Sequence, residues 1–511
     1  MSTIKHKQLN KRKKKIQNRL EQAATMDSGA PVFTASNIHY ELSQRVGGIG
    51  FGGIGAMMQL VNKIGLAKKI DDNLPILKCN RPYHESDHIL NIAFNCLMGN
   101  RCLEDLELLR NDINYLDALG ATKIPDPTTA GDFCRRFSTD SIMRFQEIIN
   151  EARLVVWNQQ REAFFEEAVI DADGVVVETT GECKKGMGLS YNGKWGYHTL
   201  VISLANTNEH LYLMNRPGNR PSHEGAAPLL NKSIDLCTRA GFKKVRLRGD
   251  TDFSQTTHLD GWDDRGVTFV FGIDAKKNLL NRAESLAEGS WEALDRKEKY
   301  EIKTSRRARP ANVKKRIVQE NGYKNLRLKS EHVAEFDYQP VACDRQYRMV
   351  VVRKNISVER GEDRLFDEIR YFFYISNDRY ATKEKVVEHA NKRCNQENLN
   401  AQLSNGIPAM KMPLDSLKSN WAYMVISGLA WTLKAWMALM MPVDGRWKTK
   451  HLAEKNKMLG MEFRTFINYF MRIPCQIINQ GRKLIYRIIG WNTMQDKFIR
   501  FMNGILRPLR C

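Results

Sequence analysis

The sequence predicts an α/β protein in which helices flank a mixed sheet, and two patterns carry this prediction. Residues 161–274 alternate β-branched segments with amphipathic ones, in the order three strands, helix, strand, helix, strand. Residues 38–160 instead repeat apolar side chains every three to four positions, which is typical of helices. The 42% hydrophobic and 27% charged residues exclude a chain that is disordered throughout.

The first predicted elements are a basic arm and a helical domain. Residues 1–37 are rich in Lys and Arg, and we expect them to be flexible. An all-helical domain follows at 38–160. Within it, PDPTTAGDFCRRF (125–137) starts with a proline and a capping threonine, which predicts a short helix.

The core is expected to begin at residues 161–274. EEAVIDADGVVVETT has β-branched residues around a polar centre and predicts its first strand. GYHTLVISLA and EHLYLMNR predict two strands that a hairpin turn joins at Asn206-Thr207-Asn208. A helix capped by Ser222 and ending near Gly241 follows. KKVRLRGD and VTFVFGID predict two further strands with a short helix between them.

A charged, irregular stretch at residues 275–368 interrupts this order. We interpret it as a β-rich insertion domain, with YRMVVVRKN as its clearest strand. The core resumes at 369–442 with the strand EIRYFFYISN and a long helix from Thr382 to about Leu403. A basic helical region is expected at 443–511.

Residues 421–441 form a nearly apolar stretch that is long enough to cross a bilayer. The stretch contains Lys434 and directly follows a soluble α/β pattern. We therefore expect a buried core helix and no membrane partner.

Positive charge is concentrated in three segments. The chain carries +21, with +6 in residues 1–30, +8 in 301–330 and +10 in 443–511, so the remainder is about neutral. Such concentration favours DNA as a partner, since each neutralised phosphate releases a counterion. An anionic membrane or a solvated face is the alternative. Arg135 and Arg136 are candidate DNA contacts, although a surface pair on an ordinary helix explains them equally well.

The ten cysteines include no Cys-x-x-Cys pair and no cluster with zinc spacing. Scattered cysteines fit a reducing cytosol. The N-terminus is basic and polar without an apolar segment behind it, so we expect no secretory signal and a cytoplasmic location.

Four acidic residues stand out by their context. Asp173 ends AVIDAD on the first core strand, and Asp171 lies two positions earlier on the same face. Asp250 ends the strand VRLRGD, at the edge where α/β sheets usually place their chemistry. Glu397 shares one face of the long helix with Arg393, and that face is expected to meet the sheet.

Acids from two strands and one helix suit phosphodiester cleavage. Two divalent ions can activate the attacking oxygen and stabilise the leaving one, and carboxylates are the ligands that magnesium prefers. We expect Asp173, Asp250 and Glu397 to be catalytic and to bind metal, with Asp171 close by. Either Asp171 or Asp173 could be the essential first acid.

Several motifs then carry a family resemblance. They are Ile170-Asp171-Ala172-Asp173, the hairpin segment GYHTLVISLANTNEHLYLMNRPGNRPSH, Arg248-Gly249-Asp250-Thr251-Asp252-Phe253 and Arg393-x-x-x-Glu397-Asn398. In this order they resemble the DDE transposases of bacterial insertion sequences, specifically the 1380-type family, over roughly residues 36–440.

The resemblance implies a ribonuclease-H-like fold with an insertion between Asp250 and Glu397. It implies an endonuclease active in DNA recombination that binds the ends of its element, cleaves them with two Mg²⁺ ions and joins them to target DNA. Mn²⁺ is expected to substitute for Mg²⁺. The expected partners are double-stranded DNA and a second copy of the chain, at the nucleoid. Arg248 and Arg393 are expected to contact DNA.

The sequence also departs from the family pattern. Ala390 and Ser404 stand where the related signature has Tyr and Lys, Thr199 replaces a proline, and Asp252 replaces a glycine. The first two departures affect how the helix would hold DNA phosphates, not the metal-binding acids.

The insertion carries its own candidate DNA contacts: Arg306, Arg307, Lys314, Lys315 and Arg316. We expect it to fold beside the acids. Its Trp291 could stack on an extruded base, or it could pack the insertion's own small core.

Two other functions remain open at this point. A domesticated DNA-binding protein of the same ancestry would bind without cutting, and a ribonuclease-H-like nuclease would only hydrolyse.

Overall fold

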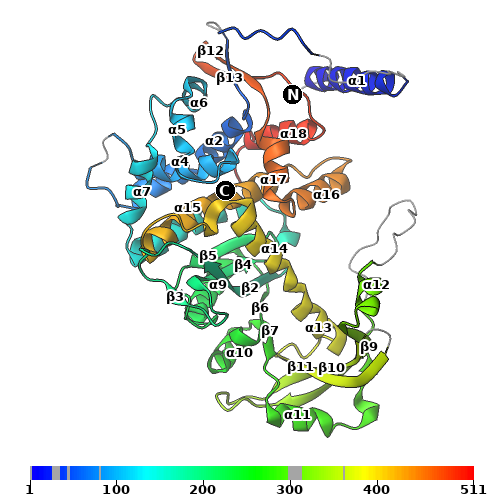
Figure 1. Cartoon of the computed structure of the whole chain (residues 1–511). Coiled ribbons are helices and arrows are strands. Elements are labelled where there is room, and N and C mark those ends of the chain that lie inside the picture. Colours follow the sequence, from blue (N-terminus) through cyan, green and yellow to red (C-terminus); the bar gives the residue numbers. More distant parts are fainter. Residues whose placement is uncertain are drawn as a thin grey trace.

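The structure is a computed structural model that describes residues 3–25, 35–42, 46–79, 82–296, 313–360 and 363–510. Figure 1 shows three regions along the molecule. The N-terminal helices and the C-terminal region lie at one end, the central sheet lies in the middle, and the insertion lies at the other end.

The central sheet is mixed. Its core strands are β2 (Ala168–Glu178), β3 (Gly188–Leu189), β4 (Trp195–Leu204), β5 (Glu209–Met214), β6 (Val245–Gly249) and β7 (Thr268–Ile273). Strands β5, β4, β2, β6 and β7 lie next to one another in this order; the first three are antiparallel and the last three parallel. The predicted hairpin joins β4 to β5, with Asn208 in the left-handed region at φ 56°.

Helices cover this sheet. They are α9 (Ala226–Ala240), α10 (Leu259–Asp264), α13 (Lys383–Lys392), α14 (Cys394–Ala401) and α15 (Leu417–Leu439). Helix α9 begins after Gly225, so the predicted cap at Ser222 is wrong: Gly225 adopts φ 77°, and the chain turns into the helix there. It ends at Gly241, as predicted.

Helix α15 contains residues 421–439 of the apolar stretch and packs against α4 (Glu85–Leu97), α8 (Thr139–Trp157) and β5. Among the described residues it is the one helix that is long and apolar enough to cross a membrane, and its apolar stretch is completely buried. Burial inside the protein therefore explains its composition. Lys434 lies in this core, where its Nζ donates to the Leu459 carbonyl at 2.8 Å and lies 3.7 Å from the Trp431 ring centroid.

The insertion extends the central sheet. It comprises α11 (Lys277–Glu284), β8 (Glu292–Ala293), α12 (Val313–Glu320), β9 (Lys324–Tyr338), β10 (Tyr347–Arg360) and β11 (Asp363–Ser376). It is β-rich, as predicted. Strand β11 pairs with β10 on one side and with β7 on the other. The expected boundary at residues 368–369 therefore divides a single strand, because β11 belongs to both sheet portions.

The N-terminal region is mostly helical. Its elements are α1 (Thr3–Thr25), β1 (Gly47–Ile49), α2 (Gly53–Ile64), α3 (Leu66–Asn73), α4 (Glu85–Leu97), α5 (Leu106–Arg110), α6 (Ile113–Leu119), α7 (Pro127–Arg135) and α8 (Thr139–Trp157). The expected basic arm contains helix α1, since its Lys, Arg, Gln and Ala residues favour helix and neither Gly nor Pro interrupts them.

The C-terminal region is not wholly helical. It contains α16 (Lys448–Leu459), α17 (Phe463–Phe466), β12 (Cys475–Gln480), β13 (Lys483–Ile488) and α18 (Gln495–Ile505). Strands β12 and β13 form a hairpin around Gly481 and Arg482, both at positive φ, and β12 also pairs with β1. This small sheet corrects two expectations, since neither terminal region is purely helical.

Candidate active site

Asp173 and Asp250 lie side by side because the strands that lead to them, β2 and β6, are parallel neighbours. In the register of β2 and β6, Asp171 lies opposite Arg248. Asp173 and Asp250 each lie two residues farther along, just beyond the last pair of the two strands. Strand β6 ends before Asp250, whereas β2 continues past Asp173 to Glu178 and pairs there with β4. Asp250 directly follows β6, and its Oδ1 accepts the Asp252 amide of the next 3₁₀ turn at 3.1 Å.

Asp171 and Arg248 form an ion pair inside the protein. Arg248 Nε and Nη2 donate to the two oxygens of Asp171 at 2.6 and 2.7 Å, and both side chains are buried. This bidentate contact uses both carboxylate oxygens of Asp171. Asp171 and Arg248 therefore lie in the sheet interior, and the expectation that Arg248 contacts DNA is not met, because its guanidinium is buried.

The next acid, Glu397, comes from the predicted long helix, which the structure divides in two. Helix α13 ends at Lys392, α14 begins at Cys394, and Arg393 occupies the joint between them. Val386 and Val387 of α13 are buried in a small core with valines of the insertion strands. This packing holds the joint next to Asp173 and Asp250.

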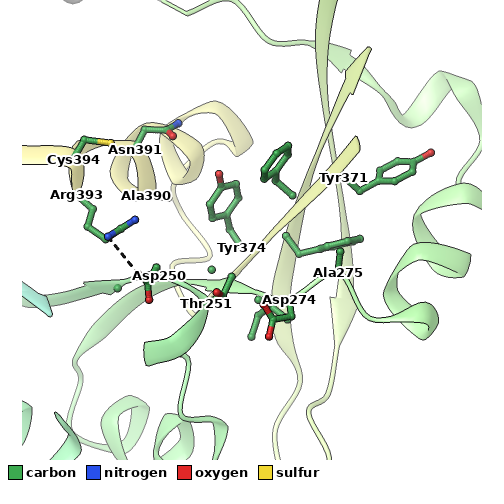
Figure 2. A pocket seen from close by; sticks show the side chains of 15 residues that line it. Asp250, Thr251, Asp274, Ala275, Tyr371, Tyr374, Ala390, Asn391, Arg393 and Cys394 are labelled. Atoms are coloured by element: carbon green, nitrogen blue, oxygen red, sulfur yellow. Dashed lines mark ion pairs between the residues drawn. The ribbon is translucent and has the colours of Figure 1, made fainter. Parts of the chain in front are cut away.

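Arg393 lies between the two strand acids. Its Nη1 is 3.9 Å from Asp173 Oδ1 and 3.7 Å from Asp250 Oδ2, and Figure 2 shows the contact with Asp250. The guanidinium thus supplies one positive charge to two carboxylates.

Helix α14 is attached to the sheet through two amides. Gln396 Nε2 donates to the carbonyl of Val201, the residue opposite Asp173 on β4, at 2.9 Å. Asn400 Nδ2 donates to Asp173 Oδ2 at 2.8 Å. Glu397 lies one helical turn from both Arg393 and Asn400 on the same face, and its side chain is exposed.

The pKa of Asp173 is raised to about 6, chiefly by burial and also by the charges of Asp250 and Glu397, while Arg393 opposes this rise. Burial also raises the pKa of Asp250, again against the effect of Arg393. The single charge of Arg393 therefore does not offset the burial of the two carboxyls. Three acids with mutual repulsion and one guanidinium form a site whose donor chemistry suits a hard divalent cation.

Asp173, Asp250 and Glu397 do not lie as close together as we expected. Within the described ranges, no group of three or more His, Cys, Asp or Glu side chains is gathered tightly enough to hold a metal ion. Arg393 separates Asp173 from Asp250, Asp171 is engaged by Arg248, and Glu397 faces solvent. A shared cation would require Arg393 to leave its position between the two aspartates.

A cavity of about 360 Å³ opens beside Asp250 and Arg393. Figure 2 shows Asp274 and Tyr374 on its walls, which come from the ends of β7 and β11, with Asn391 contributed by α13. The cavity therefore lies between the ends of β6 and β7, strand β11 and the joint that contains Arg393.

The other residues that were predicted to contact DNA lie far from the acids in the sequence. They differ in whether their side chains are already engaged in ion pairs. Arg135 is exposed but pairs with Asp132 and Asp415, both at 2.9 Å. Arg136 is exposed. On α12, Lys314 and Arg316 are exposed, and Arg316 pairs with Glu320 at 3.4 Å. Arg306, Arg307 and the side chain of Lys315 lie outside the described residues.

Trp291 packs within the insertion. Its ring centroid lies 6.2 Å from that of Tyr371 on β11, and the Arg353 guanidinium of β10 lies 4.3 Å from the indole centroid. The alternative that Trp291 packs the insertion's own core therefore agrees with the structure.

Two polar residues near the acids, Gln396 and Asn400, were not predicted from the sequence. Their signal was present: Asn400 lies seven positions after Arg393 and three after Glu397, which is the spacing of one helical face. Asn and Gln are common on exposed helices, so this spacing alone did not separate them from surface residues.

Comparison with known proteins points to one family. No curated protein matches the chain. A solved structure of piggyBac transposase in a synaptic complex with hairpin DNA is similar to it, with 10% identity over 84% of this chain and 88% of that one and a TM-score of 0.36. The family model described as transposase DDE domain group 1 matches residues 50–509, which is most of the chain. The protein therefore belongs to the DDE transposases of this group.

Proposed function

We propose that this transposase binds the ends of a mobile element, cleaves the phosphodiester bonds there and joins the ends to target DNA. Family membership supports an enzyme that acts on DNA. The observation that carries the proposal is the placement of Asp173 and Asp250 just beyond the last pair of the parallel strands β2 and β6, where one Arg393 guanidinium contacts both, with Glu397 on the adjoining helix α14.

The catalytic core is proposed to be ribonuclease-H-like. The strand order β5, β4, β2, β6, β7 supports this, because the antiparallel hairpin of β5 and β4 lies beside three parallel strands, β2, β6 and β7. The N-terminal helices, the insertion and the basic C-terminal region are then additions to that core. The 1380-type subfamily remains our expectation from the motifs.

Asp173, Asp250 and Glu397 are proposed to hold the cation, with Mg²⁺ as the physiological ion, Mn²⁺ as a substitute and two ions in the complete site. Bound divalent ions would stabilise charge on the attacking and leaving oxygens of the phosphodiester. Arg393 is the neighbouring side chain that could move from the carboxylates to a DNA phosphate. Asp171 is assigned a structural role, since Arg248 uses both of its oxygens.

The proposed partners are double-stranded DNA and a second copy of the chain, since two ends must be cut and joined together. Arg136 and the basic residues of α12 are proposed to contact DNA, as is Arg135 if its pairs with Asp132 and Asp415 open. The enzyme would act in the cytoplasm at the nucleoid.

The test uses purified full-length protein and linear DNA that carries the sequences flanking its gene. Asp173→Asn, Asp250→Asn and Glu397→Gln are each expected to reduce strand cleavage by at least a thousandfold while end binding changes less than about threefold, because phosphate contacts dominate affinity. Exposed Glu182→Gln is the matched control and should cleave as wild type.

Normal cleavage by the Asp250→Asn variant would refute the assignment. Binding without cleavage by the wild-type protein would favour a domesticated DNA-binding protein. Cleavage without joining to a target would favour a nuclease that only hydrolyses.

A further inference from the structure

The side chain of Asn400 has one amide end occupied and the other unpaired. Its Nδ2 donates to Asp173 Oδ2 at 2.8 Å. Its Oδ1 is buried and has no hydrogen-bond partner among the described residues. The residue as a whole is 8% exposed, so solvent does not readily reach this oxygen.

The chemistry of its neighbour fixes the orientation of this amide. A carboxylate oxygen accepts hydrogen bonds, so the end of Asn400 that faces Asp173 must be the NH₂ group. Turning the amide over would place the amide oxygen against a carboxylate oxygen of Asp173, where both atoms are acceptors. The unpaired end is therefore Oδ1, an acceptor that requires a donor or a cation.

An unpaired buried acceptor is unfavourable, because the group has lost its hydrogen bonds to water without gaining one in the protein. The helix nevertheless holds Asn400 firmly in place. Its carbonyl accepts the Ser404 hydroxyl at 2.9 Å, and a π-helical turn at Gln402–Gly406 follows directly. Such turns are frequent at functional sites, because they set the direction of neighbouring side chains.

The surroundings indicate a cation as the missing partner. Asn400 shares its helical face with Arg393 and Glu397, and it contacts Asp173. Amide oxygens are ordinary ligands of hard divalent cations and partners of their bound water. No other acceptor on this face is both buried and directly bonded to one of the acids within the described ranges.

We propose that Asn400 is a fourth side chain of the cation site: its Nδ2 orients Asp173, and its Oδ1 supplies an oxygen to the cation or to its bound water. This inference rests on the proposed function of Asp173 as a cation ligand. It assigns to α14 two contributions, the charge of Glu397 and the neutral oxygen of Asn400.

The experiment measures Mn²⁺ binding to the full-length, metal-stripped protein without DNA, by isothermal titration calorimetry and by electron paramagnetic resonance of free Mn²⁺. Asn400→Leu removes both polar ends at similar volume and is expected to weaken Mn²⁺ binding by about 10–100-fold, the usual effect of losing a residue that supports a metal ligand. Asn400→Asp keeps an oxygen and adds charge, so it should bind Mn²⁺ at least as tightly as wild type.

Asn395→Leu is the matched control, because Asn395 lies on the same helix with an exposed side chain. Thermal unfolding without metal verifies that each variant folds, and Asn400→Ala replaces Asn400→Leu if the latter does not. Equal Mn²⁺ affinity of folded Asn400→Leu and Asn395→Leu would overturn the inference. Equal weakening by Asn400→Asp and Asn400→Leu would overturn the role of Oδ1.

Asp173→Asn separates this inference from the proposed function. If Asp173→Asn loses Mn²⁺ binding and Asn400→Leu keeps it, only the role of Asn400 is wrong. If Asp173→Asn binds Mn²⁺ as wild type does, the cation site itself is wrong, and the assignment of Asn400 is wrong with it.

Discussion

Arg393 and the two strand acids define the electrostatics of the site at the level of single residues. One guanidinium lies 3.7–3.9 Å from two carboxylates whose pKa values are raised by burial. Arg393 offsets only part of the negative charge of the two carboxylates, so a further positive charge would stabilise their ionised forms. This arrangement makes the protein sensitive to pH at the same residues that are proposed to bind the cation.

We predict that the metal-free protein loses stability as pH rises through the titration of Asp173. Its pKa is about 6 when folded, against an ordinary value of 3.8, so the unfolded chain releases this proton first. Between these values the folded state binds more protons, and the free energy of unfolding falls with increasing pH, by up to ~3 kcal/mol.

Urea unfolding of wild type and Asp173→Asn from pH 4 to pH 7, with chelator present, measures this effect. The stability of wild type relative to the variant should fall across this range and then level off. Excess Mg²⁺ should reduce the fall, because a cation favours the ionised carboxylate. A difference that does not change with pH would contradict the raised pKa of Asp173.

At the level of elements, the parallel strands β2 and β6 carry two different kinds of acid. Asp171 is paired with Arg248 inside the sheet, while Asp173 and Asp250 lie just beyond the last pair of the two strands, where both contact Arg393, and Asp250 lines the cavity. The ion pair joins the two strands immediately below the site, and Arg248 Nη1 also donates to the His389 carbonyl of α13 at 3.3 Å. It therefore connects the strands to the helix that leads to Arg393.

We predict that Asp171→Ala destabilises the fold, by about 3–5 kcal/mol, since it leaves the buried Arg248 charge uncompensated. The double variant Asp171→Leu with Arg248→Met should recover part of this loss, because no charge then remains buried. Chemical denaturation measures both free energies of unfolding. Glu178→Ala breaks the exposed pair with Lys194 and should change stability little.

The same variants separate a structural role from a catalytic one. If Asp171→Ala is as stable as wild type and yet abolishes cleavage, Asp171 is the essential first acid and Asp173 is not. Destabilisation with residual cleavage below the melting temperature would support the structural assignment.

Over the whole molecule, positive charge gathers at the two termini and in the insertion, while the acids lie in the middle. Helix α1 carries eight basic residues and one acidic residue, Glu21. Its Arg12 donates to the carbonyls of Ile488 and Gly490 at 2.9–3.2 Å, so α1 contacts the end of the C-terminal hairpin. The N-terminal and C-terminal basic segments therefore meet.

We predict that removing residues 1–25 weakens DNA binding for all sequences alike and flattens its dependence on salt, with a slope smaller by ~0.9 for each phosphate that the protein no longer neutralises. Changing Lys11, Lys13, Lys14 and Lys15 together to Gln keeps the helix and Arg12, and should have a similar effect. Fluorescence anisotropy over a series of salt concentrations measures the slope. An unchanged slope for both variants would exclude α1 from the DNA interface.

The sequence alone determined the order of the core elements and the positions of three acids on them. Alternation of β-branched residues reveals a strand wherever it lies, and the hairpin at Asn206–Asn208 and the strand before Asp250 follow from local chemistry. Lys434 within an apolar stretch was enough to favour a core helix, and its contacts with Leu459 and Trp431 explain how the charge is accommodated there.

Only the tertiary structure decided which acid is held in a buried ion pair and which is not. Asp171 and Asp173 lie on the same face of one strand, but the register of β2 against β6 pairs Asp171 with an arginine and leaves Asp173 just beyond the last residue that pairs with β6. The break at Arg393 and the contact of Asn400 with Asp173 depend on how two helices pack on a sheet from distant segments. Local patterns identify elements, because backbone preferences are local. The partners of buried polar groups come from residues far apart in the chain, and only the folded structure brings these residues together.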